Sequence, residues 1–343
     1  SFRPVITLNG ENLWKSGDGS ASNPYEIQDL PETLSERLLS DKSTRPGERT
    51  DFSTVLTTDN TKTLYTGTED GTTVYYFAGN ATDNWVKFGG YYWRIIRTNA
   101  DGSTRMLYHG TSTTATDAYI GTSTFNSTYN DPMYVGYIYG TSNSTAIDRS
   151  NTNNSTIKEV IDVWYKNNLN TNYGKYISTT AAYCNDRNVI DGTYNTSSFS
   201  YAGRTRLYSN KAPTYNCLTT EDKFTITGNI GNGKLTYPIA LMTADEISYA
   251  GGVYDKNSLT WYYYNSVKSS STGSINWWLI SPFNWYGNTA YTFLVYGSTH
   301  YGGLGNSYVF NILGVRPVLS LKADVVYISG DGTGSSPYEI ITD

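Results

Sequence analysis

The chain repeats its own beginning near its end. Residues 2–27 read FRPVITLNGENLWKSGDGSASNPYEI, and residues 315–340 read VRPVLSLKADVVYISGDGTGSSPYEI. The offset is a constant 313 residues without a gap, and 13 of the 26 aligned positions are identical. Self-similarity at a fixed period is typical of tandem arrays. We therefore predict that residues 1–28 are the tail of a preceding unit or a connector strand. Residues 29–343 then form one unit that closes with its own copy of the segment, residues 314–341.

The amino-acid composition argues against some classes of partner. Charged residues make up 16% of the chain, well below the usual quarter, and the net charge is only −5. A weakly acidic chain without a Lys/Arg cluster argues against nucleic acid as a partner. No apolar run approaches about 18 residues, so we predict no membrane insertion. A length of 343 residues fits one domain with insertions or two closely packed subdomains.

The chain has two cysteines, Cys184 and Cys217. Its polar, tyrosine-rich and lysine-poor composition favours an extracellular setting, in which the two thiols would form a disulfide. The alternative is a pair of buried free thiols. A disulfide closing this loop would contribute about 3–4 kcal/mol in the chain-entropy model.

Three segments carry helix signals. Residues 30–42 can form a short amphipathic helix. Thr156 and Glu159 fit a capping box, followed by apolar residues at helical spacing. Thr243 and Glu246 form a second such box, and Gly251-Gly252 marks the end of that helix.

Strand signals surround these helices. Residues 85–98 are apolar and strand-prone, broken by Gly89-Gly90, and a turn at 99–102 predicts that 103–109 returns as the second arm of a hairpin. Residues 110–155 are rich in Thr, Ser, Asn, Tyr and Gly, and we expect them to form a long surface insertion. Two main helices among many short strands predict an α+β fold. The other expected strands are 74–77, 235–242, 277–280, 291–296, 308–312 and 315–321.

One long segment near the C-terminus is uncharged. No Asp, Glu, Lys or Arg occurs from Ser269 to Val315, and residues 284–311 are dominated by Tyr, Asn, Thr, Ser and Gly. This mixture is favoured in antibody-like binding surfaces, where aromatic rings give rigid contact area and small polar groups give adaptable hydrogen bonds. The alternative is a half-buried sheet that shares the bias of the whole chain. As anchors of a binding surface we expect Trp285, Tyr286, Tyr296 and Tyr301.

Short motifs in this region resemble those of known families. Trp277-Trp-Leu-Ile-Ser-Pro282, followed by a polar stretch and then Gly314-Val-Arg-Pro-Val-Leu-Ser-Leu321, resembles the C-terminal part of C-type-lectin-fold proteins. In particular it resembles the ligand-binding variable proteins of diversity-generating retroelements and the formylglycine-generating-enzyme-like domains. The resemblance implies a C-type-lectin-like fold with short twisted antiparallel strands and long loop insertions. It is firmest over 235–321.

A second set of motifs, Tyr183-Cys-Asn-Asp-Arg187, Thr243–Ile247 and Tyr249-Ala-Gly-Gly252, is similar to repeat-bearing surface proteins of Gram-positive gut bacteria and their prophages. In the retroelement family the variable region ends the protein, whereas here a GDG…PYEI segment follows it. The first resemblance implies ligand-binding positions at Asn284, Tyr286, Asn288, Tyr291, Tyr296, Ser298, His300, Tyr301, Asn306 and Tyr308.

Catalytic patterns are weak in this sequence. The histidines are His109 and His300, and neither stands beside a nucleophile-elbow motif. Asp245-Glu246 could be paired carboxylates of a glycosidase, but adjacent helical residues point in different directions and a helix cap already accounts for Glu246. Oxidase activity of the formylglycine type does not carry over, because Cys217 lies well before the lectin-like motifs.

The repeated segments contain two further candidate sites. Asp18 and Asp331 stand in Gly-Asp-Gly motifs that form a turn or, as the less favoured alternative, bind calcium. Arg3 and Arg316 each precede a proline in a predicted strand, and we expect them to pair with a carboxylate or with backbone carbonyls.

These observations predict a non-enzymatic extracellular recognition or adhesion domain that needs no cofactor and no metal. It would bind a protein or a glycan through residues 284–311 and stand on a cell surface or on a phage or filament surface. The alternative is a structural building block of a stalk or filament, joined through the repeated segment to neighbouring copies. An enzyme such as a glycosidase is a third hypothesis.

Overall fold

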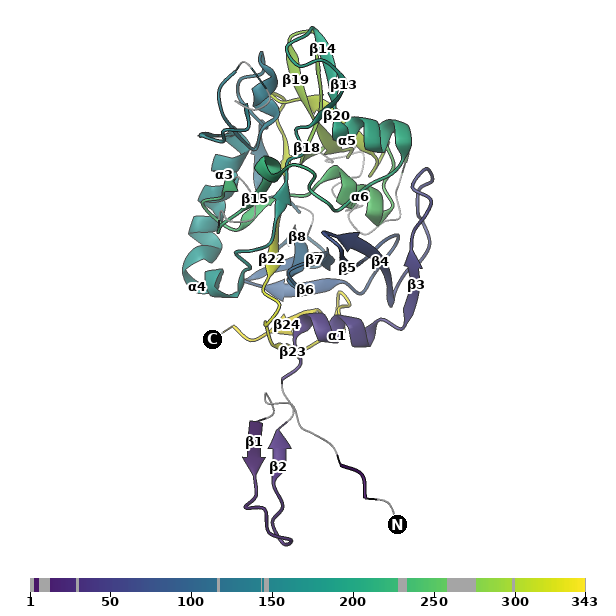
Figure 1. The fold of residues 1–343 in the computed structure, drawn as a ribbon, viewed down its shortest axis with the longest axis vertical. Helices are drawn as coiled ribbons and strands as arrows, with labels where there is room; N and C mark the ends of the chain where they lie inside the picture. Colours follow the sequence, from purple (N-terminus) through teal and green to yellow (C-terminus); the bar gives the residue numbers. More distant parts are fainter. Residues whose placement is uncertain are drawn as a thin grey trace.

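The computed structural model describes residues 3–5, 13–28, 31–115, 118–142, 144, 148–227, 233–257, 276–297 and 300–342. Strands predominate and helices are interspersed among them, so the predicted α+β class is confirmed. Figure 1 shows the body of the molecule, with the N-terminal hairpin β1–β2 extending away from it.

The larger sheet has the strand order β17-β22-β8-β7-β5-β4-β3, with β6, β24 and β23 joined to it at β7. The predicted hairpin is present as β7 and β8, and the turn at Gly89-Gly90 divides the expected strand 85–98 into β6 and β7. The bounds are β3 (Thr44–Glu48), β4 (Thr63–Glu69), β5 (Thr72–Tyr76), β6 (Trp85–Phe88), β7 (Tyr91–Thr98), β8 (Thr104–Gly110), β17 (Ile239–Leu241), β22 (Pro317–Leu321), β23 (Tyr327–Ser329) and β24 (Tyr338–Ile340).

The second sheet has the order β13-β14-β18-β19-β20, and β21 and β9 join it at β18. The strand expected at 308–312 is placed wrongly, because β20 ends at Tyr308 and a turn follows. The bounds are β9 (Gly121–Ser123), β13 (Val189–Gly192), β14 (Ser198–Tyr201), β18 (Trp277–Tyr286), β19 (Thr289–Val295), β20 (Leu304–Tyr308) and β21 (Leu313–Val315).

The predicted helices are present. Helix α1 (Leu34–Asp41) begins at a capping box of Thr33 and Glu36. Helix α6 (Ala244–Ala250) begins at the predicted box of Thr243 and Glu246 and ends at Gly251, whose φ of +117° favours glycine.

Helix α3 (Thr156–Tyr165) begins one residue earlier than expected. Its N-cap is Ser155, whose hydroxyl accepts a hydrogen bond from the backbone N–H of Lys158, so the predicted box starting at Thr156 is wrong. Its buried face includes Ile157 and Ile161, as the spacing predicts.

The remaining elements are short. They are β1 (Leu13–Ser16), β2 (Glu26–Gln28), η1 (Pro132–Val135), β10 (Ile138–Tyr139), β11 (Asn153–Asn154), η2 (Lys166–Asn170), α4 (Thr171–Tyr173), η3 (Gly174–Tyr176), β12 (Tyr183–Cys184), α5 (Ala202–Arg204), η4 (Thr205–Asn210), η5 (Thr220–Asp222), β15 (Lys223–Thr225) and β16 (Gly233–Lys234).

Residues 110–155 are not a surface insertion as expected. Phe125, Val135, Tyr137 and Ile138 from this segment are buried in the main core, and β9 pairs with β21. The polar composition conceals these few apolar side chains, which are spaced too irregularly to predict a strand or a helix.

One core joins the two sheets. Trp93 of the larger sheet and Trp278 of the second sheet are both fully buried in the same apolar cluster. The indole N–H of Trp278 donates to the carbonyl of Ser123 at 2.9 Å, so this large ring is also satisfied as a hydrogen-bond donor. The core therefore holds β18, and with it the strands that carry the candidate site, in a fixed position.

Candidate functional site

The candidate site lies on the hairpin formed by β18 and β19. Tyr286 pairs with Thr289, and the two residues between them, Gly287 and Asn288, have φ values of +56° and +68°. Positive φ at both central residues is the geometry of a type I′ turn, which matches the twist of paired strands. The turn places Tyr286 at the tip of the hairpin, where 62% of its surface is exposed.

Strand register then brings further rings to the same face. Tyr291 pairs with Asn284 of β18 on one side and with Tyr308 of β20 on the other. Directly opposed residues of antiparallel strands share one face of the sheet, and so do residues two apart along a strand. Tyr286, Tyr291 and Tyr308 therefore stand on one side of the second sheet.

Two more aromatic residues extend this group. The ring centroids of Tyr291 and Tyr308 are 4.6 Å apart, Phe310 stacks on Tyr308 at 5.3 Å, and Tyr129 meets Phe310 at 4.7 Å. Tyr129 belongs to the segment 110–155, and its carbonyl accepts a hydrogen bond from the backbone N–H of Ala290. We call Tyr129, Tyr286, Tyr291, Tyr308 and Phe310 the aromatic surface.

The aromatic surface is rigid and uncharged. Tyr129, Tyr286, Tyr308 and Phe310 are exposed, while Tyr291 is half-buried between its neighbours. Burial, together with a hydrogen bond to Tyr308, raises the pKa of Tyr291, so its hydroxyl stays protonated at neutral pH. Contact area of this kind suits stacking and hydrogen bonding rather than proton transfer.

Trp285 lies on the opposite face of the hairpin. Only 6% of its surface is exposed, and its indole N–H donates to the carbonyl of Thr196 at 3.1 Å. It lines an open hollow together with Asn130, Asp131, Asn195 and Asn288. Trp285 is thus part of the floor of this hollow rather than a projecting anchor.

The structure separates the other predicted positions from the aromatic surface. Tyr296 and His300 lie toward the other end of the β19–β20 pair. Asn306 lies between that end and Tyr308, and its amide donates to the hydroxyl of Tyr254 at 2.6 Å. Five residues of extended strand separate Tyr291 from Tyr296, a span of roughly 16 Å.

Burial also differs among these positions. His300 is exposed, whereas Asn284, Tyr296, Tyr301 and Asn306 are half-buried. Ser298 lies outside the described residues. Exposure therefore does not follow position along the strands, because exposed His300 lies at the far end and half-buried Asn284 pairs with Tyr291 near the tip.

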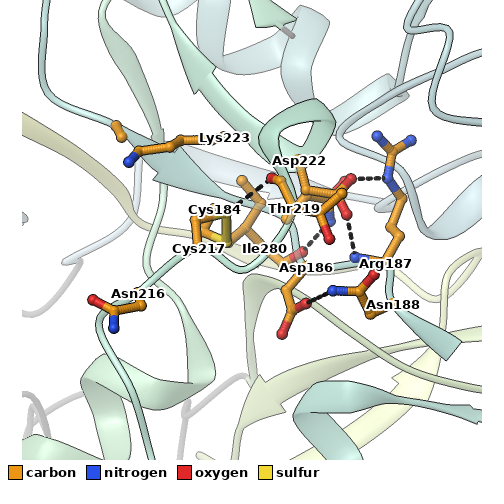
Figure 2. The surroundings of a disulfide bond; sticks show 12 residues. Cys184, Asp186, Arg187, Asn188, Asn216, Cys217, Thr219, Asp222, Lys223 and Ile280 are labelled. Carbon is orange, nitrogen blue, oxygen red and sulfur yellow. Dashed lines mark hydrogen bonds and ion pairs between the residues drawn. A yellow bond between two sulfur atoms is a disulfide. The ribbon is translucent and has the colours of Figure 1, made fainter. Parts of the chain in front are cut away.

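A disulfide joins Cys184 and Cys217, as the sequence predicts. Figure 2 shows it beside Asp222, a fully buried carboxylate that accepts a hydrogen bond from the side chain of Arg187 at 2.6 Å. The backbone N–H of Asn185 donates to the carbonyl of Asp222 at 2.9 Å, which ties the two chain segments together. The disulfide therefore closes a cross-linked region that also contains buried ion pairs.

The carboxylates considered for catalysis belong to a buried ion network. Glu246 accepts from Arg97 at 3.1 Å and from Arg105 at 2.8 Å, in addition to its helix-capping role. Asp245 and Arg206 are 2.7 Å apart. The capping interpretation of Glu246 is confirmed, and the arginines engage both side chains.

The remaining candidates have structural partners. Arg316 is buried, donates to the carbonyl of Tyr108 and lies over the ring of Trp277 at 4.8 Å. The expected pairing with a backbone carbonyl is confirmed for Arg316, although the carbonyl belongs to β8 and not to the repeated segment, whereas Arg3 is exposed. His109 is buried with its ring 4.4 Å from that of Trp85. Burial, helped by the charges of Arg316 and Arg94, lowers the pKa of His109 and keeps it neutral.

Asp18 and Asp331 each accept a hydrogen bond from the backbone N–H two residues further on, at 2.9 and 3.0 Å. This geometry is an Asx turn, so the turn interpretation of the Gly-Asp-Gly motifs is confirmed. Over the described residues, no group of three or more His, Cys, Asp or Glu side chains is placed to hold a metal ion.

Sequence reasoning missed Tyr129 and Phe310. The Gly-Asn pair at 287–288 between two apolar runs is a hairpin signal, and it identifies the tip at Tyr286. No local signal connects Tyr129 with that hairpin, because the contact joins segments more than 150 residues apart.

Comparisons of the chain with protein-family models, curated proteins and solved structures found no match. In the part of the chain that the structure describes, no helix is long and apolar enough to cross a membrane.

Proposed function

We propose that this protein is a non-enzymatic, extracellular recognition domain that binds a protein or a glycan through the aromatic surface. The observation that carries the proposal is the continuous contact from Tyr129 through Phe310 and Tyr308 to Tyr291 on one exposed sheet face. Exposed aromatic clusters of this size on a rigid scaffold are typical of interaction sites.

The scaffold supports this role. We propose that it is of the C-type-lectin type, on the strength of the Trp277–Pro282 and Gly314–Leu321 motifs. In the structure these motifs lie in β18 and in β21–β22, at the base of the proposed site. The disulfide and the buried ion network would keep such a site in shape outside the cell.

The test is binding by variants that keep the fold. The double variant Tyr286→Ala/Tyr308→Ala removes two exposed rings, and Tyr208→Ala removes a ring of η4 that is 46% exposed as a control. On panels of glycans and of host proteins, we expect a ligand of the native chain to lose at least about tenfold in affinity with the double variant and nothing with the control. The proposal fails if every ligand found binds the double variant as tightly as the native chain.

The repeated terminal segments favour a second role, as the joint between units of a stalk or filament. The observation behind it is that β1–β2 and β23–β24 form the same hairpin. Removing residues 1–28 tests this role, because joined copies should then separate by sedimentation analysis. An unchanged assembly state would refute it.

A further inference from the structure

The two terminal hairpins share one strand register. Adding 313 to two of the three residue pairs of β1–β2 gives both pairs of β23–β24, and both ladders carry a register shift at the same place. The pairs are Trp14–Ile27 and Ser16–Glu26 in the first hairpin, and Tyr327–Ile340 and Ser329–Glu339 in the second.

Their turns agree as well. Gly17 and Gly330 both have φ of +95°, and a Cβ on either would lie 2.0 Å from the carbonyl oxygen of the following Pro24 or Pro337. Only glycine fits such a turn. The repeated sequence therefore specifies the same hairpin twice.

The surroundings of the two hairpins differ. The C-terminal hairpin lies on α1 and β6: β24 pairs in parallel with β6 through Tyr338–Val86 and Glu339–Lys87. The backbone N–H of Trp85 donates to the carbonyl of Gly332 at 2.8 Å. We call α1, β6 and the adjoining residues Glu32 and Thr33 the hairpin-docking surface.

Side chains of the C-terminal hairpin meet specific groups on this surface. The hydroxyl of Tyr338 donates to Asp41 at 2.9 Å, and the guanidinium of Arg37 lies 5.0 Å from the ring centroid of Tyr327. The backbone N–H of Tyr327 donates to the carbonyl of Glu32 at 2.9 Å. These contacts bury Tyr338 completely.

The corresponding residues of the N-terminal segment, where the structure describes them, are exposed and pack against no docking surface. Tyr25 corresponds to Tyr338 and is 67% exposed, and Trp14 corresponds to Tyr327 and is 68% exposed. Val5 is 93% exposed, while its counterpart Val318 is fully buried in β22 between β17 and β8. Among the described residues of the N-terminal hairpin, every hydrogen bond and ion pair stays within the hairpin.

We propose that the N-terminal segment docks on a second copy of this unit, where it displaces that copy's own β22, β23 and β24 and takes their place. The hydroxyl of Tyr25 then donates a hydrogen bond to the residue of the second copy that is equivalent to Asp41. The ring of Trp14 packs against the second copy's equivalent of Arg37, and Glu26 forms an ion pair with its equivalent of Lys87. This inference rests on the proposed role as a joint between units of a stalk or filament, and it identifies the surface on which the joint forms. The N-terminal segment also has the glycine that this surface requires. Gly19 corresponds to Gly332, and a Cβ atom at Gly332 would lie only 2.4 Å from the carbonyl oxygen of Asp83.

One counterpart departs from the pattern. Val325 is buried beside α1, and Asn12 takes its place in the N-terminal segment. The experiment below keeps Val325, so it tests the hairpin alone.

The test is a graft within the full chain, in which residues 326–341 are replaced by the sequence of residues 13–28. The grafted chain then carries two identical hairpins, one at its N-terminus and one on the docking surface, so each molecule contains its own control. We expect amide hydrogens of the grafted hairpin to exchange at least about 100-fold more slowly than those of the N-terminal copy. Equal exchange rates in a folded chain would overturn the proposal.

A gentler pair of variants keeps the test decisive if the graft does not fold. Tyr327→Trp introduces the ring of Trp14 at the docked position, and Tyr327→Ala removes the ring. We expect the Trp variant to unfold at the denaturant concentration of the native chain and the Ala variant to unfold at a lower one. A Trp variant as weak as the Ala variant would overturn the proposal. A graft whose two hairpins exchange equally, while removal of residues 1–28 still separates the copies, would defeat the docking assignment and leave the structural role standing. An assembly state unchanged by that removal would defeat both.

Discussion

The hydroxyl of Tyr338 donates a hydrogen bond of 2.9 Å to the carboxylate of Asp41, across 297 residues of sequence. This contact fixes the C-terminal hairpin on α1, at the opposite end of the unit in the chain. Lys42 adds its ammonium group 5.4 Å from the ring centroid of Tyr338. The unit is therefore closed by a contact between its first helix and its last strand.

This closure predicts unequal effects of one substitution at two equivalent positions. Tyr338→Ala removes a fully buried ring and should lower the free energy of unfolding by about 3–5 kcal/mol. Tyr25→Ala removes an exposed ring in the same hairpin sequence and should change it by less than about 0.5 kcal/mol. Urea unfolding of both variants measures the difference, and equal losses would contradict the assignment of Tyr338 as the closing contact.

Glu246 gives a prediction on stability and pH. Burial alone would raise its pKa, but the guanidinium groups of Arg105 and Arg97 outweigh burial and the pKa of Glu246 is lowered in the folded chain. A depressed carboxyl pKa contributes stability above the unfolded value of 4.5, and this contribution is lost as pH falls through the folded value. Glu246→Gln leaves Arg105 without its carboxylate and should cost about 3 kcal/mol at pH 7.

The matched control is Glu339→Gln, since Glu339 forms a solvent-exposed pair with Lys87 and should cost less than about 1 kcal/mol. Urea unfolding at several pH values checks the prediction. The loss caused by Glu246→Gln should shrink below about pH 4.5. A loss that stays constant across this range would show that the charge of Glu246 does not stabilise the fold.

Asp148 predicts a pH effect of the opposite sign. Burial, reinforced by the nearby Asp131 and opposed by Arg187 and Arg149, raises the pKa of Asp148 to about 7 from 3.8. Between these values the folded chain holds a proton that the unfolded chain has released, so stability falls as pH rises from about 4 to 7. Asp148→Asn removes this penalty because the amide is never charged.

We therefore expect Asp148→Asn to unfold at a higher urea concentration than the native chain at pH 8, and at nearly the same concentration below pH 4. Native and variant chains measured side by side cancel the contributions of other groups. A difference that does not change with pH would mean that folding does not raise the pKa of Asp148.

Local patterns in the sequence were sufficient for part of the fold. The capping box of Thr243 and Glu246, the turn at 99–102 and the repeated Gly-Asp-Gly turns each depend on residues within a few positions of one another, and all are confirmed. The disulfide was also predictable, because only two cysteines are available.

Features that depend on distant contacts were not predictable. The burial of Phe125 and Tyr137 in a polar segment follows from packing against other elements, which composition does not reveal. The side of the sheet on which Trp285 lies depends on strand register, since a shift by one residue reverses inside and outside. The aromatic surface was therefore found only in part, through Tyr286, Tyr291 and Tyr308.

The alternation along β18 gives a further prediction on stability. Trp285→Ala removes a buried ring and its hydrogen bond to Thr196, and should cost about 3–5 kcal/mol. Tyr286→Ala, one residue further along, removes an exposed ring and should cost less than about 0.5 kcal/mol. Thermal or urea unfolding of the two variants shows which of the two rings is buried. A larger loss of stability in Tyr286→Ala than in Trp285→Ala would show that β18 buries the opposite face.

The disulfide between Cys184 and Cys217 should stabilise the fold measurably because it lowers the conformational entropy of the unfolded chain. It links residues 33 positions apart, and removing it with Cys184→Ser/Cys217→Ser should cost about 2–4 kcal/mol. We expect the substitution to weaken the ion pair between Arg187 and Asp222 as well, since these side chains belong to the two segments that the disulfide joins. Urea unfolding of the native chain with and without a reducing agent, compared with the double variant, measures the effect. The native chain under reduction should match the variant, and a reducing agent that lowers the variant's stability as well would show that the loss does not come from this bond.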